Sequence, residues 1–212
     1  PANRSYFAGT GPQTNALAAG GYSGSAEMNT TFRYDGTNWT SAPNLGTGRY
    51  YTQNGAIGTG SNTWIAGGGG SPLATTTTEE FNSSTNTITM GQVRSVVGGF
   101  GTQTAALMCG GNHPGTAQHA NAEQYDGTSF SEQNDMGTAR SQLGSCGTLT
   151  AGLVFGGDVY PTSPRNTGVT EEWDGSSFSE QTDMGTVRRS IGSFGTQTAA
   201  VAAAGYVTAA IA

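Results

Sequence analysis

The sequence predicts an all-β fold built from repeated four-stranded antiparallel sheets, and three observations lead to that prediction. A stretch that begins with glycine recurs with starts at Gly11, Gly58, Gly101, Gly147 and Gly195, which are 47, 43, 46 and 48 residues apart. Short apolar runs alternate with glycine-rich and Asp-Gly turns, as in strands joined by tight connections. No segment keeps a helical period. A period in the forties is typical of a propeller or a solenoid array.

The repeat at residues 138–185 shows the expected strands. Thr150–Phe155 is a continuous apolar run, which predicts a strand covered on both faces, and Gly156-Gly157 ends it with a sharp exit. Val169–Trp173 alternates in polarity as a third strand, and Asp174-Gly175 supplies the turn after it. The other two strands are a small-residue first strand at Arg140–Gly147 and a polar fourth strand at Phe178–Met184. Four strands in meander order fit a propeller blade better than a solenoid coil.

Three recurring features of the repeat resemble the kelch repeat. They are a Gly-Gly pair after the second strand, an aromatic residue that ends the third strand with another shortly after, and an arginine that opens the first strand. The pairs are Gly20-Gly21, Gly67-Gly68, Gly110-Gly111 and Gly156-Gly157, and the aromatic residues are Tyr34, Phe81, Tyr125 and Trp173, followed by Trp39, Phe130 and Phe178.

The resemblance covers nearly the whole chain and implies one kelch-like β-propeller domain over residues 1–212. The blades span about 1–46, 47–92, 93–137 and 138–185, and 186–212 supplies the first two strands of an incomplete fifth blade. Blade two departs from the pattern, because polar Asn86 stands where the second aromatic is expected and Ile88 is the nearest apolar residue. A ring must remove its open edges. Three solutions remain open: an abbreviated five-bladed ring, a longer chain with more blades, or an edge completed by another subunit.

Composition narrows the partners and the chemistry. The net charge is −6, the eight basic residues are all arginine, and charged residues make up only 10%. This balance argues against nucleic acid or an anionic membrane surface as the main partner, and no apolar run is long enough to span a bilayer. Cys109 and Cys146 lie on apolar strands of neighbouring repeats, which favours buried thiols over a disulfide. We expect no cofactor.

Arginine recurs at one position of every repeat, near the predicted axial mouth. A ring of guanidinium groups there would hold a carboxylate or sulfate through bidentate hydrogen bonds. The structural alternative is that each arginine is internal and either pairs with the third-strand acids Glu79, Glu123 and Glu171 or caps loop carbonyl groups, and a once-per-blade recurrence favours this alternative. The recurring arginines are Arg4, Arg49, Arg94, Arg140 and Arg188.

The loops between the second and third strands are the longest and the least alike, which is how a regular scaffold presents a binding surface. Ordinary solvated loops are the alternative interpretation. A metal at the two histidines would need a third ligand such as Asp158, and no motif supports a catalytic nucleophile. We therefore predict neither a metal site nor a catalytic site. The candidate contact residues are Tyr22, His113, His119, Tyr160 and Arg165.

A narrower resemblance suggests a setting for the fold. Asp-Gly-Thr-Ser-Phe at 126–130, Met-Gly-Thr-Ala-Arg at 136–140 and Gly-Thr-Gln-Thr-Ala-Ala at 101–106 resemble kelch-like arrays of bacteriophage tail-fibre and virion-surface proteins, particularly of marine phages. The resemblance implies a non-enzymatic adhesion or structural module in an extracellular or virion-surface location, with virion proteins, host glycans or further copies of itself as partners. The alternative is a lectin with repeated sites between blades, for which Trp39, Trp173, Tyr34 and Tyr125 would matter.

Overall fold

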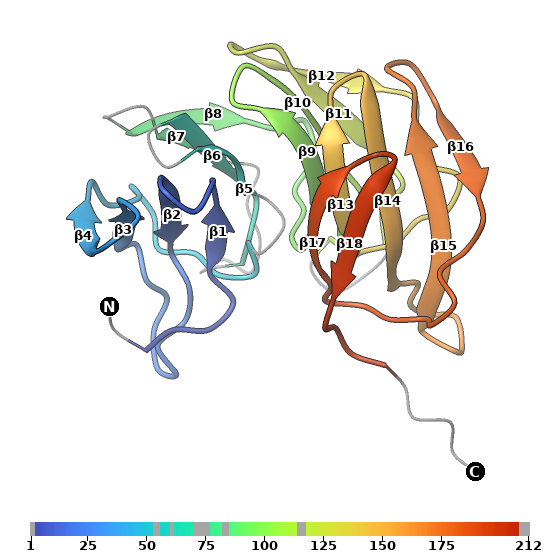
Figure 1. Ribbon diagram of the computed structural model, residues 1–212, viewed down its shortest axis with the longest axis horizontal. Helices are drawn as coiled ribbons and strands as arrows, with labels where there is room; N and C mark the ends of the chain where they lie inside the picture. The colour runs from blue at the N-terminus through green and yellow to red at the C-terminus, as the bar shows by residue number, and fades with distance from the viewer. Residues whose placement is uncertain are drawn as a thin grey trace.

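The computed structural model describes residues 3–52, 56–59, 62–69, 77–81, 85–113 and 118–207. These residues form an all-β structure of four four-stranded antiparallel sheets and one two-stranded sheet. In Figure 1 the sheets follow one another in an arc from the blue N-terminal sheet to the red hairpin. Within the described ranges, no helix is both long and apolar enough to cross a membrane.

Each sheet with its loops is called a unit here, and the units are numbered one to five along the chain. Consecutive strands pair within each unit, so every complete unit is a meander, as predicted. Unit one holds β1 (Ala8–Thr10), β2 (Ala16–Ala19), β3 (Thr31–Tyr34) and β4 (Trp39–Ala42), and unit two holds β5 (Ala56–Thr59), β6 (Asn62–Ala66), β7 (Thr77–Phe81) and β8 (Thr85–Thr89). Unit three holds β9 (Gly98–Thr102), β10 (Ala105–Cys109), β11 (Ala122–Tyr125) and β12 (Phe130–Gln133), and unit four holds β13 (Gly144–Thr148), β14 (Ala151–Asp158), β15 (Asn166–Trp173) and β16 (Phe178–Gln181). Unit five holds β17 (Gly192–Thr196) and β18 (Ala199–Ala203).

The first strands of successive units lie side by side and, with Ala16–Ala18 of β2 and Trp39 of β4, line a cavity of about 430 Å³. Hydroxyl groups join these strands in place of a backbone ladder. The Ser145 hydroxyl accepts from the Gly99 N–H at 2.9 Å and donates to the Gly99 carbonyl at 3.0 Å. Ser193 makes the same two contacts with Ser145, at 2.9 and 3.0 Å. The small first-strand residues read from the sequence therefore let neighbouring units meet closely.

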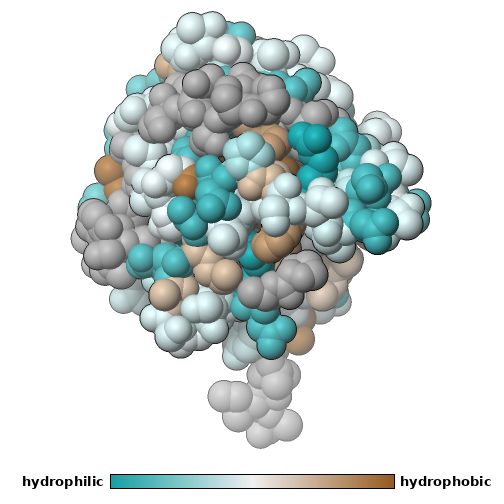
Figure 2. Space-filling view, turned by 90° about the vertical axis from the view of Figure 1, so that its left-hand side faces the viewer, coloured by the Kyte–Doolittle hydropathy of each residue, from teal (hydrophilic) through white to brown (hydrophobic). Residues whose placement is uncertain are grey.

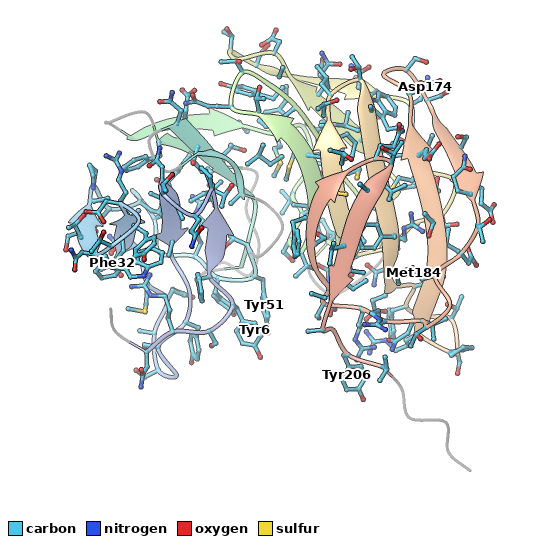
Figure 3. All side chains as sticks on the ribbon, in the orientation of Figure 1. Tyr6, Phe32, Tyr51, Asp174, Met184 and Tyr206 are labelled. Atoms are coloured by element: carbon cyan, nitrogen blue, oxygen red, sulfur yellow. The ribbon has the colours of Figure 1, made fainter. Side chains whose placement is uncertain are left out.

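The Asp-Gly turns between third and fourth strands have a local cause. Asp126 Oδ1 accepts the N–H groups of Thr128 and Ser129 at 2.8 and 2.9 Å, and Gly127 takes the positive φ of 96° that the turn needs. These hydrogen bonds lower the pKa of the Asp126 carboxyl. Asp174 makes the same turn at the upper end of the molecule in Figure 3. Recurring acids at this position are thus structural.

The core lies between the sheets. Phe100 on β9 packs with Leu107, Val154 and Trp173, so side chains of units three and four share one cluster. Gly152 makes room for this contact, because a Cβ atom there would lie 2.1 Å from the Phe100 ring. On the outside, the view in Figure 2 shows mostly hydrophilic and neutral residues with scattered apolar ones, as the Thr-, Ser- and Asn-rich composition predicts.

In each of units two, three and four, a buried arginine binds the connection that leads into the first strand to later strands of the same unit. Arg94 is fully buried, and its guanidinium group donates to the carbonyl oxygens of Gly110 and Asn121 at 3.4 and 2.7 Å. It also forms an ion pair with Glu123, whose second oxygen accepts the Gly91 N–H at 2.7 Å. We call this arrangement the arginine clamp. Arg49 pairs with Glu79 at 2.5 Å and Arg140 with Glu171 at 3.1 Å in the same way.

Several details differ from the sequence expectation. The arginines precede the first strand by four residues in units one, three, four and five, instead of opening it, because the clamp belongs to the connection between units. β14 continues through Gly156-Gly157 to Asp158, with an irregularity in register where the pair lies. β8 forms in unit two, and the side chain of Asn86, the predicted weak point, lies outside the described part.

The two cysteines are free and buried. Burial raises the pKa of Cys109 to about 12 and that of Cys146 to about 11, since a low-dielectric environment disfavours the thiolate. Both residues therefore serve as small core side chains.

The arginine clamp generates a stability prediction. Glu123→Gln leaves the buried Arg94 charge without its counter-charge, so the free energy of unfolding in urea should fall by about 3–5 kcal/mol. The exposed Glu132 on the neighbouring strand provides the matched control, and Glu132→Gln should change the value by less than about 0.5 kcal/mol. Equal effects of the two substitutions would show that the ion pair does not hold the unit together.

The contact between units generates a second prediction. Gly152→Ala places a methyl group against the Phe100 ring and should lower the free energy of unfolding by about 1–3 kcal/mol, because this core has no room to spare. Gly185→Ala is the control, since no atom lies within 4 Å of a Cβ at that position. Thermal unfolding of both variants tests this, and an unchanged midpoint for Gly152→Ala would contradict the packing described.

Candidate functional site

A pocket of about 730 Å³ opens where the connections that lead into the first strands converge. It lies at the end of the molecule opposite the Asp-Gly turns, where Figure 3 places Tyr6, Tyr51 and Tyr206. Residues from every unit line this pocket, which we call the axial pocket. The lining consists of Tyr6, Tyr50, Tyr51, Ser95, Val96, Val97, Asn112, Gln142, Arg189, Ser190, Ile191, Gly192 and Tyr206.

One backbone position recurs around this pocket in an unusual conformation. Two residues after the recurring arginine, every unit places a non-glycine residue in the left-handed region, at a cost of about 1–3 kcal/mol for each. Such strain collects at binding sites because the surrounding contacts hold it in place. The residues and their φ angles are Tyr6 at 54°, Tyr51 at 58°, Val96 at 50°, Gln142 at 55° and Ser190 at 55°.

These residues are linked from unit to unit. The N–H of Val96 donates to the Tyr51 carbonyl at 3.3 Å, that of Gln142 to Val96 at 3.0 Å, and that of Ser190 to Gln142 at 2.8 Å. The hydroxyl of Ser190 is 2.7 Å from the side-chain oxygen of Gln142. The left-handed turn therefore directs one side chain per unit to the pocket and fixes its backbone through the neighbouring unit.

One wall is a cluster of tyrosines. The ring centroids of Tyr6 and Tyr51 are 4.8 Å apart, and those of Tyr50 and Tyr51 are 4.6 Å apart. Burial raises the pKa of Tyr51, and the nearby Tyr6 and Tyr50 add to the effect. The raised pKa favours the neutral phenol of Tyr51, and the wall offers flat apolar faces together with hydroxyl groups that both donate and accept hydrogen bonds.

The opposite wall carries a positive charge. Arg189 lies over the ring of Tyr206, 4.5 Å from its centroid, and donates to the Asn166 side-chain oxygen at 3.0 Å. Its guanidinium nitrogen is 3.7 Å from a carboxylate oxygen of Asp158, which is fully buried. Arg165 binds the same carboxylate at 2.5 and 3.2 Å. Two arginines therefore share one buried acid, and this wall keeps a net positive charge.

Three of the predicted loop residues lie close to the pocket lining. Tyr22 packs on Tyr50 with ring centroids 5.4 Å apart. Arg165 reaches the lining through Asp158, and its guanidinium lies over the ring of Tyr160 at 5.0 Å. The structure thus places these side chains at the margin of the pocket, with other residues forming its walls.

The two histidines are outside the lining. The rings of His113 and His119 are 6.3 Å apart, and His119 Nδ1 lies 3.3 Å from the side-chain oxygen of Asn121. Asp158, considered as a third ligand, is bound by the arginines. Over the described ranges, no three His, Cys, Asp or Glu side chains gather in a metal-binding arrangement.

The recurring arginines do not form a ring at the mouth. Arg49, Arg94 and Arg140 are at most 1% exposed and are held in their clamps, which is the structural alternative of the sequence analysis. Arg4 and Arg188 are half-buried, and neither lines the axial pocket. The cation at the pocket is Arg189. Sequence reasoning missed the position two residues after the arginine, although its unlike residues within a regular repeat were a usable signal.

The four aromatic residues predicted for repeated lectin sites differ in how exposed their side chains are. Trp173 and Tyr125 are 0% and 1% exposed, so they cannot contact a ligand between units. Trp39 is 43% exposed and packs against the half-buried Tyr34, with centroids 5.2 Å apart. Trp39 lines the cavity of about 430 Å³ beside the first strands, whereas Tyr34, Tyr125 and Trp173 line neither that cavity nor the axial pocket.

The recurring left-handed position generates a prediction that runs against the usual effect of glycine. Val96→Gly should raise the free energy of unfolding in urea by about 1 kcal/mol, because glycine adopts a φ of 50° without the steric cost of a β-branched residue. Val93→Gly, in the same loop, should lower it instead by about 0.5–1 kcal/mol. A loss of stability in Val96→Gly would contradict the strain assigned to this left-handed position.

Comparison with known proteins supports the fold. No protein-family model matches the sequence, and no curated protein matches it. Among solved structures, the structure of YjhT matches with a TM-score of 0.81, covering 96% of this chain and 78% of that chain at 8% sequence identity. At this identity the likeness concerns the fold alone.

Proposed function

We propose that this chain is a non-enzymatic adhesion or structural module of an extracellular assembly, such as a phage tail fibre, knob or virion surface. Its units would form a kelch-like β-propeller of five blades, the last incomplete, with a partner bound on the face that carries the axial pocket. The partners are other virion or surface proteins, host glycans, or further copies of the chain. The virion setting is supported only by the resemblance of the motifs at 101–106, 126–130 and 136–140.

The observation that carries the binding function is the contrast between a regular backbone and unlike side chains. The left-handed position is the same in each unit, yet it presents Tyr6, Tyr51, Val96, Gln142 and Ser190. A residue needed only for packing would repeat, as the clamp arginines do. Side chains that differ at one strained position are suited to recognising one asymmetric ligand.

The recurring acids support binding rather than catalysis. Glu79, Glu123 and Glu171 are committed to buried arginines, and Asp126 and Asp174 hold turns through backbone hydrogen bonds. Hydrolytic chemistry on a sugar would need two carboxylates facing one substrate. Among the described residues, the lining of the axial pocket contains no acid and offers tyrosine, amide, hydroxyl and arginine groups.

A carbohydrate is the ligand that this lining favours. Sugar rings have apolar C–H faces and many hydroxyl groups, and the tyrosine wall offers flat rings beside polar Asn112, Gln142 and Ser190. Arg189 adds a cation that suits a carboxylated or sulfated sugar. The lectin alternative therefore moves from repeated sites between units to one site on the axis.

A binding assay tests the function and the site together. Purified protein should bind intact host envelope and a subset of an array of charged and neutral glycans. Tyr51→Ala and Arg189→Ala should each weaken binding by about tenfold or more, because aromatic and arginine side chains at the centre of an interface dominate its affinity. Periodate treatment of the envelope should abolish binding if the ligand is a glycan and preserve it if the ligand is a protein.

Trp39→Ala is the control for that assay, because Trp39 is an exposed aromatic residue outside the axial pocket. Its binding should equal that of the unaltered chain. If only Trp39→Ala weakens binding, the ligand lies elsewhere and the site is wrong. A chain that associates with no envelope, glycan, tail or capsid component would contradict the adhesion function itself.

A further inference from the structure

One buried carboxylate holds two arginines together beside the axial pocket. Asp158 is fully buried, and its Oδ1 accepts the Tyr160 N–H at 3.0 Å and the Arg165 Nε–H at 3.2 Å. Its Oδ2 accepts from Arg165 Nη2 at 2.5 Å and lies 3.7 Å from Arg189 Nη1. The two guanidinium groups are therefore close neighbours. Since one carboxylate balances only one of them, the three side chains together keep one uncompensated positive charge.

This arrangement occurs once, although the backbone that carries it repeats. The residue after each Gly-Gly pair, or its equivalent in unit five, bridges to the residue after the recurring arginine, as Asn112 does to Ser95 and Asp158 to Ser141. A device for folding the unit would recur, as the arginine clamp does. The Asp158 position instead changes from unit to unit, which is typical of a recognition surface. Its counterparts in the other units are Tyr22, Gly69, Asn112 and Tyr206.

Gln142 connects the buried acid to the pocket. Its side-chain Nε2 lies 3.5 Å from Asp158 Oδ2, and its side-chain oxygen accepts the Ser190 hydroxyl at 2.7 Å. Both Gln142 and Ser190 line the axial pocket. Asp158 therefore orients polar groups of the lining in addition to the two arginines, without reaching the pocket itself.

Each of the two guanidinium groups keeps donors for a ligand. Within the described part of the chain, Arg165 binds Asp158 through Nε and Nη2 and makes no hydrogen bond through Nη1. Arg189 binds the Asn166 side-chain oxygen through Nη1 at 3.0 Å and makes no hydrogen bond through Nε or Nη2. The side chain of Arg165 is 48% exposed and that of Arg189 is 19% exposed. Three nitrogens are thus available, and two of them form one edge of Arg189.

A sulfate monoester fits this set of donors. It carries one negative charge, which matches the uncompensated positive charge. Two of its three terminal oxygens can accept from the free edge of Arg189, and the third can accept from Arg165. A carboxylate has only two oxygens, and a phosphate monoester carries more than one negative charge near neutral pH. Because arginine stays protonated, the site keeps its charge throughout the physiological pH range.

We propose that Arg165 and Arg189 form a binding site for the sulfate ester of a sulfated glycan. The inference deepens the proposed function and rests on it, since the axial pocket holds the sugar and the two arginines hold its sulfate. Arg165 contacts the ligand from the margin of the pocket. Asp158 is a positioning residue that keeps the two guanidinium groups together.

Titration with small anions tests the site on the unaltered 212-residue protein. Methyl sulfate is added at constant ionic strength, so that screening by salt does not change, and the NMR signals of the arginine Nε–H groups are followed. We expect saturable one-to-one binding that shifts the signal of Arg189. Acetate should bind about tenfold more weakly, because it leaves one charged donor without a partner. Equal affinity for the two anions, or no saturable binding of methyl sulfate, overturns the proposal.

Substitutions locate the site. Arg165→Gln and Arg189→Gln should each weaken methyl sulfate binding by about tenfold or more, the effect of losing a charged hydrogen bond. Arg33→Gln is the matched control, because Arg33 lies on β3 outside the axial pocket and its loss changes the net charge equally. It should leave the affinity unchanged, and an equal effect of all three substitutions contradicts the proposal. The comparison of anions needs no variant, so it decides the question even if a variant fails to fold.

A second set of ligands identifies what carries the sulfate. Glucose 6-sulfate should bind at least as tightly as methyl sulfate, and glucose should bind much more weakly. Binding of O-sulfotyrosine without binding of any sulfated sugar would indicate a protein ligand and overturn the assignment to a glycan. Envelope binding that depends on Tyr51 but is not competed by methyl sulfate removes this site and leaves the adhesion function. Methyl sulfate binding by a protein that associates with no envelope component supports the site and removes the adhesion function.

Discussion

The rest of this structure depends on the burial of one charged side chain, the clamp arginine, in each of units two, three and four. A guanidinium group out of water needs a counter-charge and acceptors for its N–H groups. The two terminal nitrogens of Arg94 find them in Gly110, Asn121 and Glu123, and Glu123 also accepts from the Gly91 N–H, whereas Arg94 Nε has no hydrogen-bond partner among the described residues. The connection between units is thereby tied to two strands at once. This glycine- and threonine-rich connection would be flexible without the clamp, and the clamp holds it in one conformation.

The axial pocket depends on these connections, because their residues form its lining. The clamp fixes the chain at its arginine. The residue two positions later is therefore held in the left-handed region and is hydrogen-bonded to its counterpart in the next unit. The repeated packing thus supports a pocket lined by unlike side chains, with tyrosines on one side, Arg189 on the other and amide or hydroxyl groups between them. The fold bears the strain at the positions where its side chains differ.

Periodic features were predictable from the sequence, and single features were not. The Gly-Gly pairs, the Asp-Gly turns and the paired Arg and Glu positions repeat, so their strand assignments and the ion pairs could be read from spacing. The pocket lining does not repeat, because each unit contributes a different side chain, and Tyr51 gave no signal beside Tyr50. The link between Arg165, Asp158 and Arg189 joins residues of separate segments, which only the folded chain brings together.

Hydroxyl bridges between first strands have a consequence for how such an assembly evolves. A continuous backbone ladder would lock each neighbour in one register and one spacing. Ser145 and Ser193 instead connect adjacent units through single rotatable groups. A gene duplication that inserts or deletes one block therefore meets no continuous backbone ladder between first strands, although the side chains that pack between units, such as Phe100 against Gly152, must still fit at the new junction. Such a scaffold can change its size while each block keeps its own internal geometry.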